Sequence, residues 1–87
     1  MPAKLTLIVR EGCHLCDDMR DALAAFRQEL DYCWTELDVD ADPDLLARYH
    51  VDVPVLLAGS THVCHHFFSL AALKNALASA PDTQTPQ

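Results

Sequence analysis

The order of strand and helix patterns in this sequence predicts an α/β fold, with a four-stranded mixed sheet flanked by three helices. Short apolar runs rich in β-branched or aromatic residues alternate with stretches whose apolar residues recur every three or four positions. The predicted order is β-α-β-α-β-β-α. Its first three elements form a unit with parallel strands and a right-handed crossover. Its last two strands can pair as an antiparallel hairpin, so the sheet should contain both kinds of pairing.

Length and charge limit the possible functions. The 87 residues, 51% of them hydrophobic, support one domain, residues 1–80, followed by a polar tail, 81–87, that we expect to be disordered. A formal net charge of −7 repels both phosphate backbones and anionic lipid headgroups, so we expect neither nucleic acid nor a membrane as partner. The apolar run at 5–9 is too short for a signal peptide, and no run is long enough to span a membrane, so a cytoplasmic location is expected.

The first strand and helix have the clearest patterns. Residues 5–9, Leu-Thr-Leu-Ile-Val, are typical of a strand buried on both faces. From His14 onward apolar residues follow a helical period. These residues are Leu15, Met19, Leu23, Phe26 and Leu30. Residues 32–39 contain strand-forming residues without that period and predict the second strand.

The second half of the chain contains two helix-start signals. Asp42 followed by Pro43 matches an N-cap and a proline at the first helical position, and predicts a short helix ending near His50. Ser69 can cap the last helix, in which Leu70, Leu73 and Leu77 share a face.

Between these two helices, the third strand is predicted at 53–57 and the fourth at 61–66. The third strand is entered through Pro54, and Gly59 with Ser60 supplies the tight turn between the strands.

Two cysteines, Cys13 and Cys16, lie where the first strand gives way to the first helix. At this spacing they can close a disulfide, bind a metal together, or attack and resolve the disulfide of another molecule. The amino terminus of a helix stabilises a thiolate and lowers its pKa from about 8.5. Cys13 therefore suits the attacking role, and Cys16, one helical turn further on, suits the resolving role.

Charged residues flank Cys13 on both sides. Arg10, and His14 when it is protonated, would stabilise the thiolate. Three carboxylates would raise its pKa instead. These belong to Glu11, Asp17 and Asp18.

Two motifs at the separation that the fold needs resemble those of glutaredoxins. Residues 10–16, Arg-Glu-Gly-Cys-His-Leu-Cys, resemble the basic-x-Gly-Cys-x-x-Cys segment of that family, and Val53-Pro54 resembles its Val-cisPro. The resemblance covers residues 5–78. The chain is thus similar to small glutaredoxin-like proteins of the thioredoxin-fold superfamily, and this resemblance implies a thioredoxin fold for residues 1–80.

The resemblance also implies a function and a site. The expected function is that of a thiol–disulfide oxidoreductase in cell redox homeostasis and electron transport, with Cys13 as nucleophile and Cys16 as resolving cysteine. The expected substrate-binding residues are Val53, Pro54, Arg10 and His14. The expected substrate is a disulfide-containing protein or glutathione, the latter as a possible co-substrate. No cofactor or metal is expected, and the chain should be a monomer.

The sequence departs from the usual glutaredoxin pattern at two places. Glutaredoxins usually carry Pro-Tyr between the cysteines, where this chain has His14 and Leu15. They also carry a Gly-Gly turn with an acidic residue before the last helix, and this turn contributes to their glutathione site. Residues 67–69 are Phe-Phe-Ser here.

A group of histidines and cysteines in the second half suggests a metal site. His62, Cys64 and His66 alternate along the predicted fourth strand and would share one face. Neighbours on one face of a flat strand are about 6.5 Å apart, which is too far for one ion without a bend. We therefore interpret these residues and His65 as edge-strand residues, and Cys33 as a small buried hydrophobic residue.

Two further classes of function fit the same cysteine pair. The chain could be a non-catalytic module that binds a metal or an iron–sulfur cluster through Cys13 and Cys16. It could also be an adaptor whose Val53 loop and exposed Phe67 or Phe68 bind a partner without redox change.

Overall fold

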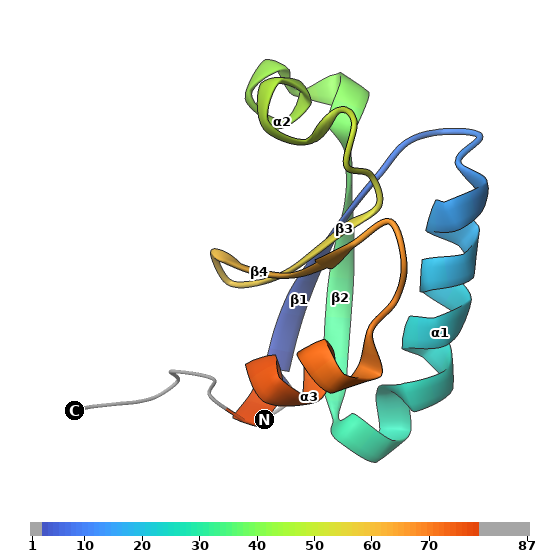
Figure 1. The fold of residues 1–87 in the computed structure, drawn as a ribbon, viewed down its shortest axis with the longest axis vertical. Coiled ribbons are helices and arrows are strands. Elements are labelled where there is room, and N and C mark those ends of the chain that lie inside the picture. Colours follow the sequence, from blue (N-terminus) through green and yellow to red (C-terminus); the bar gives the residue numbers. More distant parts are fainter. Residues whose placement is uncertain (1–2, 79–87) are drawn as a thin grey trace.

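A four-stranded sheet runs through the centre of the computed structural model, which describes residues 3–78 (Figure 1). The elements are β1 (Ala3–Val9), α1 (His14–Leu30), β2 (Tyr32–Asp38), the 3-10 helix η1 (Val39–Ala41), α2 (Pro43–Tyr49), β3 (Val55–Ala58), β4 (Thr61–His65) and α3 (Leu70–Ala78). The strand order is β2-β1-β3-β4, with β1 parallel to β2 and both other pairs antiparallel. The predicted α/β fold class is confirmed. The predicted tail, 81–87, lies outside the described residues.

Strand β1 explains how the helices divide between two faces of the sheet. Leu5, Leu7 and Val9 belong to the larger core cluster, to which α1 and α3 contribute side chains. Ile8 belongs to a smaller cluster that α2 covers through Leu45. Because successive side chains of a strand point to opposite faces, this apolar run fills two cores at once.

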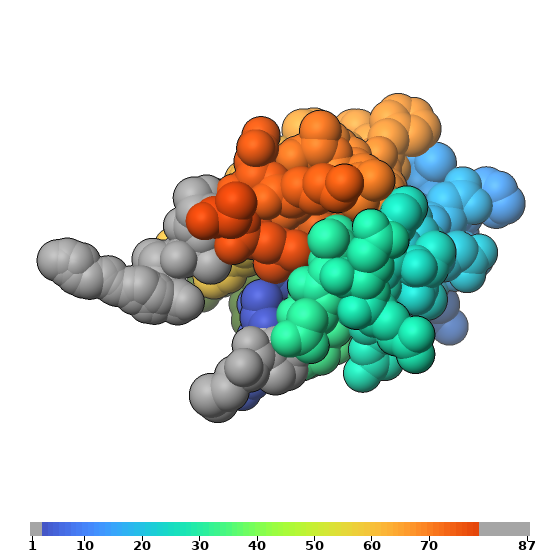
Figure 2. Space-filling view, turned by 90° about the horizontal axis from the view of Figure 1, so that it is seen from below, coloured from blue at the N-terminus to red at the C-terminus, as the bar shows by residue number. Residues whose placement is uncertain are grey.

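Helices α1 and α3 lie against each other on the larger core (Figure 2). The rings of Phe26 on α1 and Phe68, just before α3, stack with their centroids 5.8 Å apart. Ser69 caps α3 as predicted, since its hydroxyl accepts a hydrogen bond from the N–H of Ala72 at 3.1 Å. No helix among residues 3–78 is long and apolar enough to cross a membrane.

The second half differs from the prediction in two places. The predicted second strand ends at Asp38, whose side chain accepts a hydrogen bond from the N–H of Asp40 at 2.9 Å and starts the 3-10 turn η1. Asp42 caps α2 as predicted. The third strand begins at Val55, not at Val53, because the chain around Pro54 leaves the ladder.

Candidate active site around the Cys13–Cys16 disulfide

The connection between β1 and α1 places both cysteines. Gly12 has φ of +76°, a left-handed conformation that glycine adopts without steric cost. The N–H of Cys13 donates to the carbonyl of Arg10 at 3.2 Å and closes the turn. Cys13 is then the N-cap of α1, and its carbonyl accepts from the N–H of Asp17 at 3.2 Å. The predicted position of the cysteines at the start of the helix is confirmed.

Cys13 and Cys16 form a disulfide, with their Cα atoms 5.1 Å apart. Cys16 is fully buried, whereas Cys13 is half-buried, so Cys13 is the one that a second molecule can reach. The N–H of Cys16 donates to Sγ of Cys13 at 3.1 Å. A backbone N–H directed at this sulfur, at the positive end of a 17-residue helix, stabilises negative charge on it.

Val53 and Pro54 lie beside the end of β1. The ladder pairs Ile8 with Val55, so the residues preceding Val55 continue along the chain that leads to Cys13. The Val53–Pro54 peptide bond is cis. Among residues 3–78 the backbone N–H and C=O of Val53 make no hydrogen bond, and its side chain packs against the same core cluster as Cys13.

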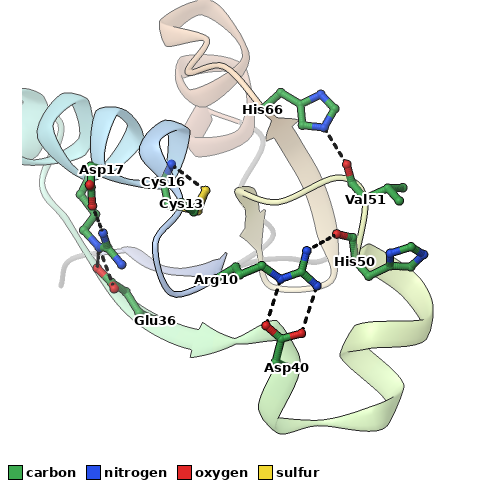
Figure 3. Close-up of a disulfide and its surroundings, with 10 residues drawn as sticks. Arg10, Cys13, Cys16, Asp17, Glu36, Asp40, His50, Val51 and His66 are labelled. Carbon is green, nitrogen blue, oxygen red and sulfur yellow. Dashed lines mark hydrogen bonds and ion pairs between the residues drawn. A yellow bond between two sulfur atoms is a disulfide. The ribbon is translucent and has the colours of Figure 1, made fainter.

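The guanidinium of Arg10 is turned towards Asp40 (Figure 3). Its Nε and Nη2 donate to the two carboxylate oxygens of Asp40 at 2.9 and 3.0 Å, and Nη1 donates to the carbonyl of His50 at 3.0 Å. The hydrogen bonds to Asp40 raise the pKa of Arg10, and the bonds from Arg10 lower the pKa of Asp40. Arg10 thus links the end of β1 to η1 and to the end of α2.

The other residues around the cysteines divide between surface and core. His14, the first residue of α1, is exposed, and Met19 is buried as expected. Arg20 joins α1 to β2, because its Nε donates to both carboxylate oxygens of Glu36 at 2.9 Å and its Nη1 donates to Asp17 at 2.6 Å.

His66 contacts the segment that contains Pro54, which its sequence position does not predict. It has φ of +63°, its N–H donates to the carbonyl of Pro54 at 2.9 Å, and its ring Nε2 bonds the carbonyl of Val51 at 2.9 Å (Figure 3). The chain from Val51 to Pro54 is therefore tied to the loop after β4. Histidine is one of the residues that adopt left-handed backbone more readily, but nothing in the local sequence indicates this pair of contacts.

The predicted alternation of His62, Cys64 and His66 on one face of β4 is wrong. A β-bulge shifts the register, since Leu56 pairs with Cys64 and Leu57 with His62, and the extra residue between them is Val63. Val63 and Cys64 are both buried as a result. His62 contacts His65 instead, with Nε2 and Nδ1 2.9 Å apart. No group of three metal-binding side chains occurs within residues 3–78.

The two free cysteines lie on the two edge strands, β2 and β4, and the prediction that Cys64 belongs to an edge strand is confirmed. Cys33, predicted to be buried, is partly exposed on the edge strand β2. Cys64 is buried, and burial raises the pKa of its thiol, against the opposing effect of a hydrogen bond with the backbone of Ser69.

These features define a thioredoxin-fold domain with a Cys-x-x-Cys pair at the start of its first helix. Residues 4–78 match the model of the Glutaredoxin-like domain (DUF836), and the chain belongs to this family. The solution structure of protein Ne2328 from Nitrosomonas europaea is 28% identical, with a TM-score of 0.78 over 86% of this chain and 91% of that one. The X-ray structure of protein XcR50 from X. campestris is 34% identical, with a TM-score of 0.71 over 88% of this chain and 99% of that one.

Thioredoxin 1 from Thermosipho africanus TCF52B shares the fold. It is 19% identical and has a TM-score of 0.58, over 91% of this chain and 94% of that one. No curated protein sequence matches the chain significantly.

Proposed function

We propose that this protein is a glutaredoxin-like thiol–disulfide oxidoreductase that uses the Cys13–Cys16 dithiol in cytoplasmic redox homeostasis. The observation that carries the proposal is the position of the half-buried Cys13 at a helix amino terminus, with its sulfur 3.1 Å from the backbone nitrogen of Cys16. Such a sulfur leaves readily as a thiolate and, once reduced, is present as thiolate in a larger fraction at neutral pH.

The reaction needs two exchanges of disulfide bonds. The Cys13 thiolate attacks one sulfur of the substrate disulfide, forms a mixed disulfide and releases the other substrate sulfur as a thiolate. The Cys16 thiol then loses its proton to solvent, attacks Sγ of Cys13 and releases the second substrate thiolate. The protein dithiol is oxidised to the disulfide, and the substrate disulfide is reduced to two thiols. No cofactor takes part.

Four further residues have proposed roles beside the cysteines. The unpaired backbone of Val53 would pair with an extended segment of the substrate, and Pro54 would shape the surface against which the substrate disulfide lies. His14 would contact the substrate from the exposed start of α1. Arg10 would act through the carbonyl of His50, by holding the chain that leads to Val53. The substrate is a protein disulfide or glutathione, and the chain acts as a monomer without nucleic acid or membrane.

The test is a count of thiols at each stage of a single turnover. Reduced protein is mixed with an equimolar small disulfide, quenched with an alkylating agent, and its mass is measured. We expect two thiols to be lost, at Cys13 and Cys16, with one substrate disulfide consumed. A Cys16→Ser variant should stop at the mixed disulfide on Cys13.

A Cys33→Ser variant is the matched control and should behave as wild type. Loss of thiols elsewhere, or a Cys13 that reacts no faster than a free cysteine, would refute the proposal. A metal that copurifies stoichiometrically and is lost in a Cys13→Ser variant would favour the metal-binding alternative instead.

A further inference from the structure

The two arginines that flank the Cys-x-x-Cys segment in the sequence, Arg10 and Arg20, are already held in ion pairs. We define the site segments as residues 10–18, 50–54 and 66–69. These segments contain one basic residue other than histidine, Arg10. It holds both carboxylate oxygens of Asp40 and the carbonyl of His50. The next arginine along α1, Arg20, is held by Glu36 and Asp17. An incoming carboxylate that binds Arg10 or Arg20 would have to break the ion pairs that these residues already form.

The charge that remains unpaired in the site segments is negative. Glu11, Asp18 and Asp52 form no ion pair within residues 3–78. Glu11 is two residues from Cys13, Asp18 is two from Cys16, and Asp52 is two from Pro54. The Cα atoms in each of these pairs are therefore within about 8 Å of each other. This is about one Debye length at physiological ionic strength, so these charges act on a substrate at the disulfide.

Arg48, in the last turn of α2, is a nearby cation without an ion pair in the described part of the chain. Its single positive charge does not cancel the three negative charges of Glu11, Asp18 and Asp52, so the sum of the unpaired charges is still negative. Glutathione has two carboxylates and one ammonium group in each half, so its disulfide would approach this site against repulsion.

Two exposed apolar side chains in the site segments suit a polypeptide substrate. Val51 and Phe67 are 66% and 69% exposed, which is unusual for large apolar residues. Both residues contact His66, whose ring bonds the carbonyl of Val51 and lies 6.4 Å from the ring of Phe67. With the unpaired backbone of Val53, they offer an extended chain both apolar contact and hydrogen bonds.

We infer that the Cys13–Cys16 site selects disulfides carried by extended, uncharged or basic polypeptide segments, and discriminates against glutathione disulfide. The inference rests on the proposed function. The carboxylates of Glu11 and Asp52 repel anionic substrates, while Val51 and Phe67 contact the side chains next to the substrate cysteine.

The first experiment compares three small disulfides of different charge. Reduced protein is mixed with cystamine, which is cationic, with bis(2-hydroxyethyl) disulfide, which is neutral, and with glutathione disulfide. Each rate is divided by the rate for dithiothreitol, an uncharged dithiol, to remove the intrinsic reactivity of the substrate. We expect cystamine to react fastest and glutathione disulfide slowest, with about tenfold between them at low ionic strength and less at high salt.

A pair of charge variants tests the location of the effect. In the double variant Glu11→Gln, Asp52→Asn, the ratio of the normalised cystamine rate to the normalised glutathione disulfide rate should fall to about threefold. The control, Glu29→Gln with Asp31→Asn, changes the net charge equally at the far end of α1 and should leave the ratio nearly unchanged. Equal narrowing in both variants would overturn the assignment to these two residues.

The second experiment tests the polypeptide contact. The substrate is a disulfide-linked dimer of a short peptide that contains valine and lysine beside its cysteine. Phe67→Ser should slow this reaction about fivefold, in proportion to the apolar area lost, and leave the cystamine rate unchanged. If Phe67→Ser slows the peptide and cystamine reactions equally, Phe67 does not contact the polypeptide substrate.

The outcomes separate this inference from the proposed function. If the neutral disulfide oxidises Cys13 and Cys16 but the normalised rates show no order with charge, the inference fails and the function stands. If no disulfide oxidises the pair faster than it oxidises free cysteine, the proposed function fails.

Discussion

The guanidinium of Arg10 joins three parts of the chain that are far apart in sequence. It follows β1 directly, bonds Asp40 of η1 with two nitrogens, and bonds the carbonyl after α2 with the third. Its position before the Cys-x-x-Cys segment suggests from the sequence alone that it stabilises a thiolate. In the folded protein its charge is balanced by Asp40, and its remaining nitrogen holds the carbonyl of His50.

We therefore predict that the Arg10–Asp40 pair stabilises the fold more than it activates Cys13. Because both side chains are partly exposed, Asp40→Asn should lower the Tm by only about 1–4 °C at pH 7. The same variant should leave the pKa of Cys13 nearly unchanged. Thermal unfolding and the pH dependence of alkylation measure the two quantities.

The difference in Tm between wild type and Asp40→Asn should become smaller as the pH falls. The pKa of Asp40 is lower in the folded protein than in the unfolded chain, because Arg10 donates hydrogen bonds to its carboxylate. The stabilisation is therefore complete above the unfolded pKa near 4 and is lost as the pH falls through the folded pKa. Wild type and Asp40→Asn should converge in Tm at low pH. A difference that grows on acidification would contradict the assignment.

The two ends of the α1 helix each have a residue in left-handed conformation, and only one of them is a glycine. Gly12, before the helix, has φ of +76°, and no heavy atom lies within 4 Å of the place of a Cβ. Asp31, after the helix, has φ of +54° and donates its N–H to the carbonyl of Arg27 at 3.0 Å. The left-handed conformation disfavours residues with a Cβ, and a carboxylate at the negative end of a helix adds repulsion.

We predict opposite changes in stability at these two positions. Asp31→Gly should stabilise the protein by about 0.5 kcal/mol, because it removes the backbone strain and the charge repulsion. Gly12→Ala should destabilise it by about 1 kcal/mol through backbone conformation alone. Urea unfolding followed by the fluorescence of Trp34 measures both.

Ala24→Gly provides the control for these two variants. Ala24 is an exposed residue of α1 in ordinary helical conformation, and glycine there should cost about 1 kcal/mol. A loss of stability at Asp31→Gly as large as at Ala24→Gly would show that the left-handed strain is not relieved.

The helices and their caps could be predicted from the sequence, because their signals lie within one or two turns of the chain. Helix α1, its start at Cys13 and the cap at Asp42 follow from residues within one or two turns. The bulge at Val63 does not, because it depends on how β4 fits β3 and the core beneath it. The contacts of His66 with Val51 and Pro54 join segments more than ten residues apart and have no local signature.

The whole molecule combines a strongly negative surface with two protected sheet edges. The edge strand β4 has five residues and carries the bulge, and the other edge strand, β2, carries Glu36 in an ion pair with Arg20. Bulges and charged residues on edge strands oppose pairing between molecules. At neutral pH the net charge of −7 adds repulsion between copies.

We predict from this balance that the protein is a monomer at pH 7.5 and associates near its isoelectric point of about 4.8. The net charge is zero at the isoelectric point, so the repulsion disappears there while the exposed Val51 and Phe67 remain. Light scattering coupled to size exclusion should give about 9.6 kDa at pH 7.5 and larger species near pH 4.8. Glu29→Gln with Asp31→Asn should move the onset to higher pH. In the oxidised protein Cys13 is already in a disulfide and has no free thiol. If a reductant dissolves the larger species of this oxidised form, the association comes from an intermolecular disulfide and not from loss of charge. That disulfide would be assigned to Cys33, the partly exposed free cysteine.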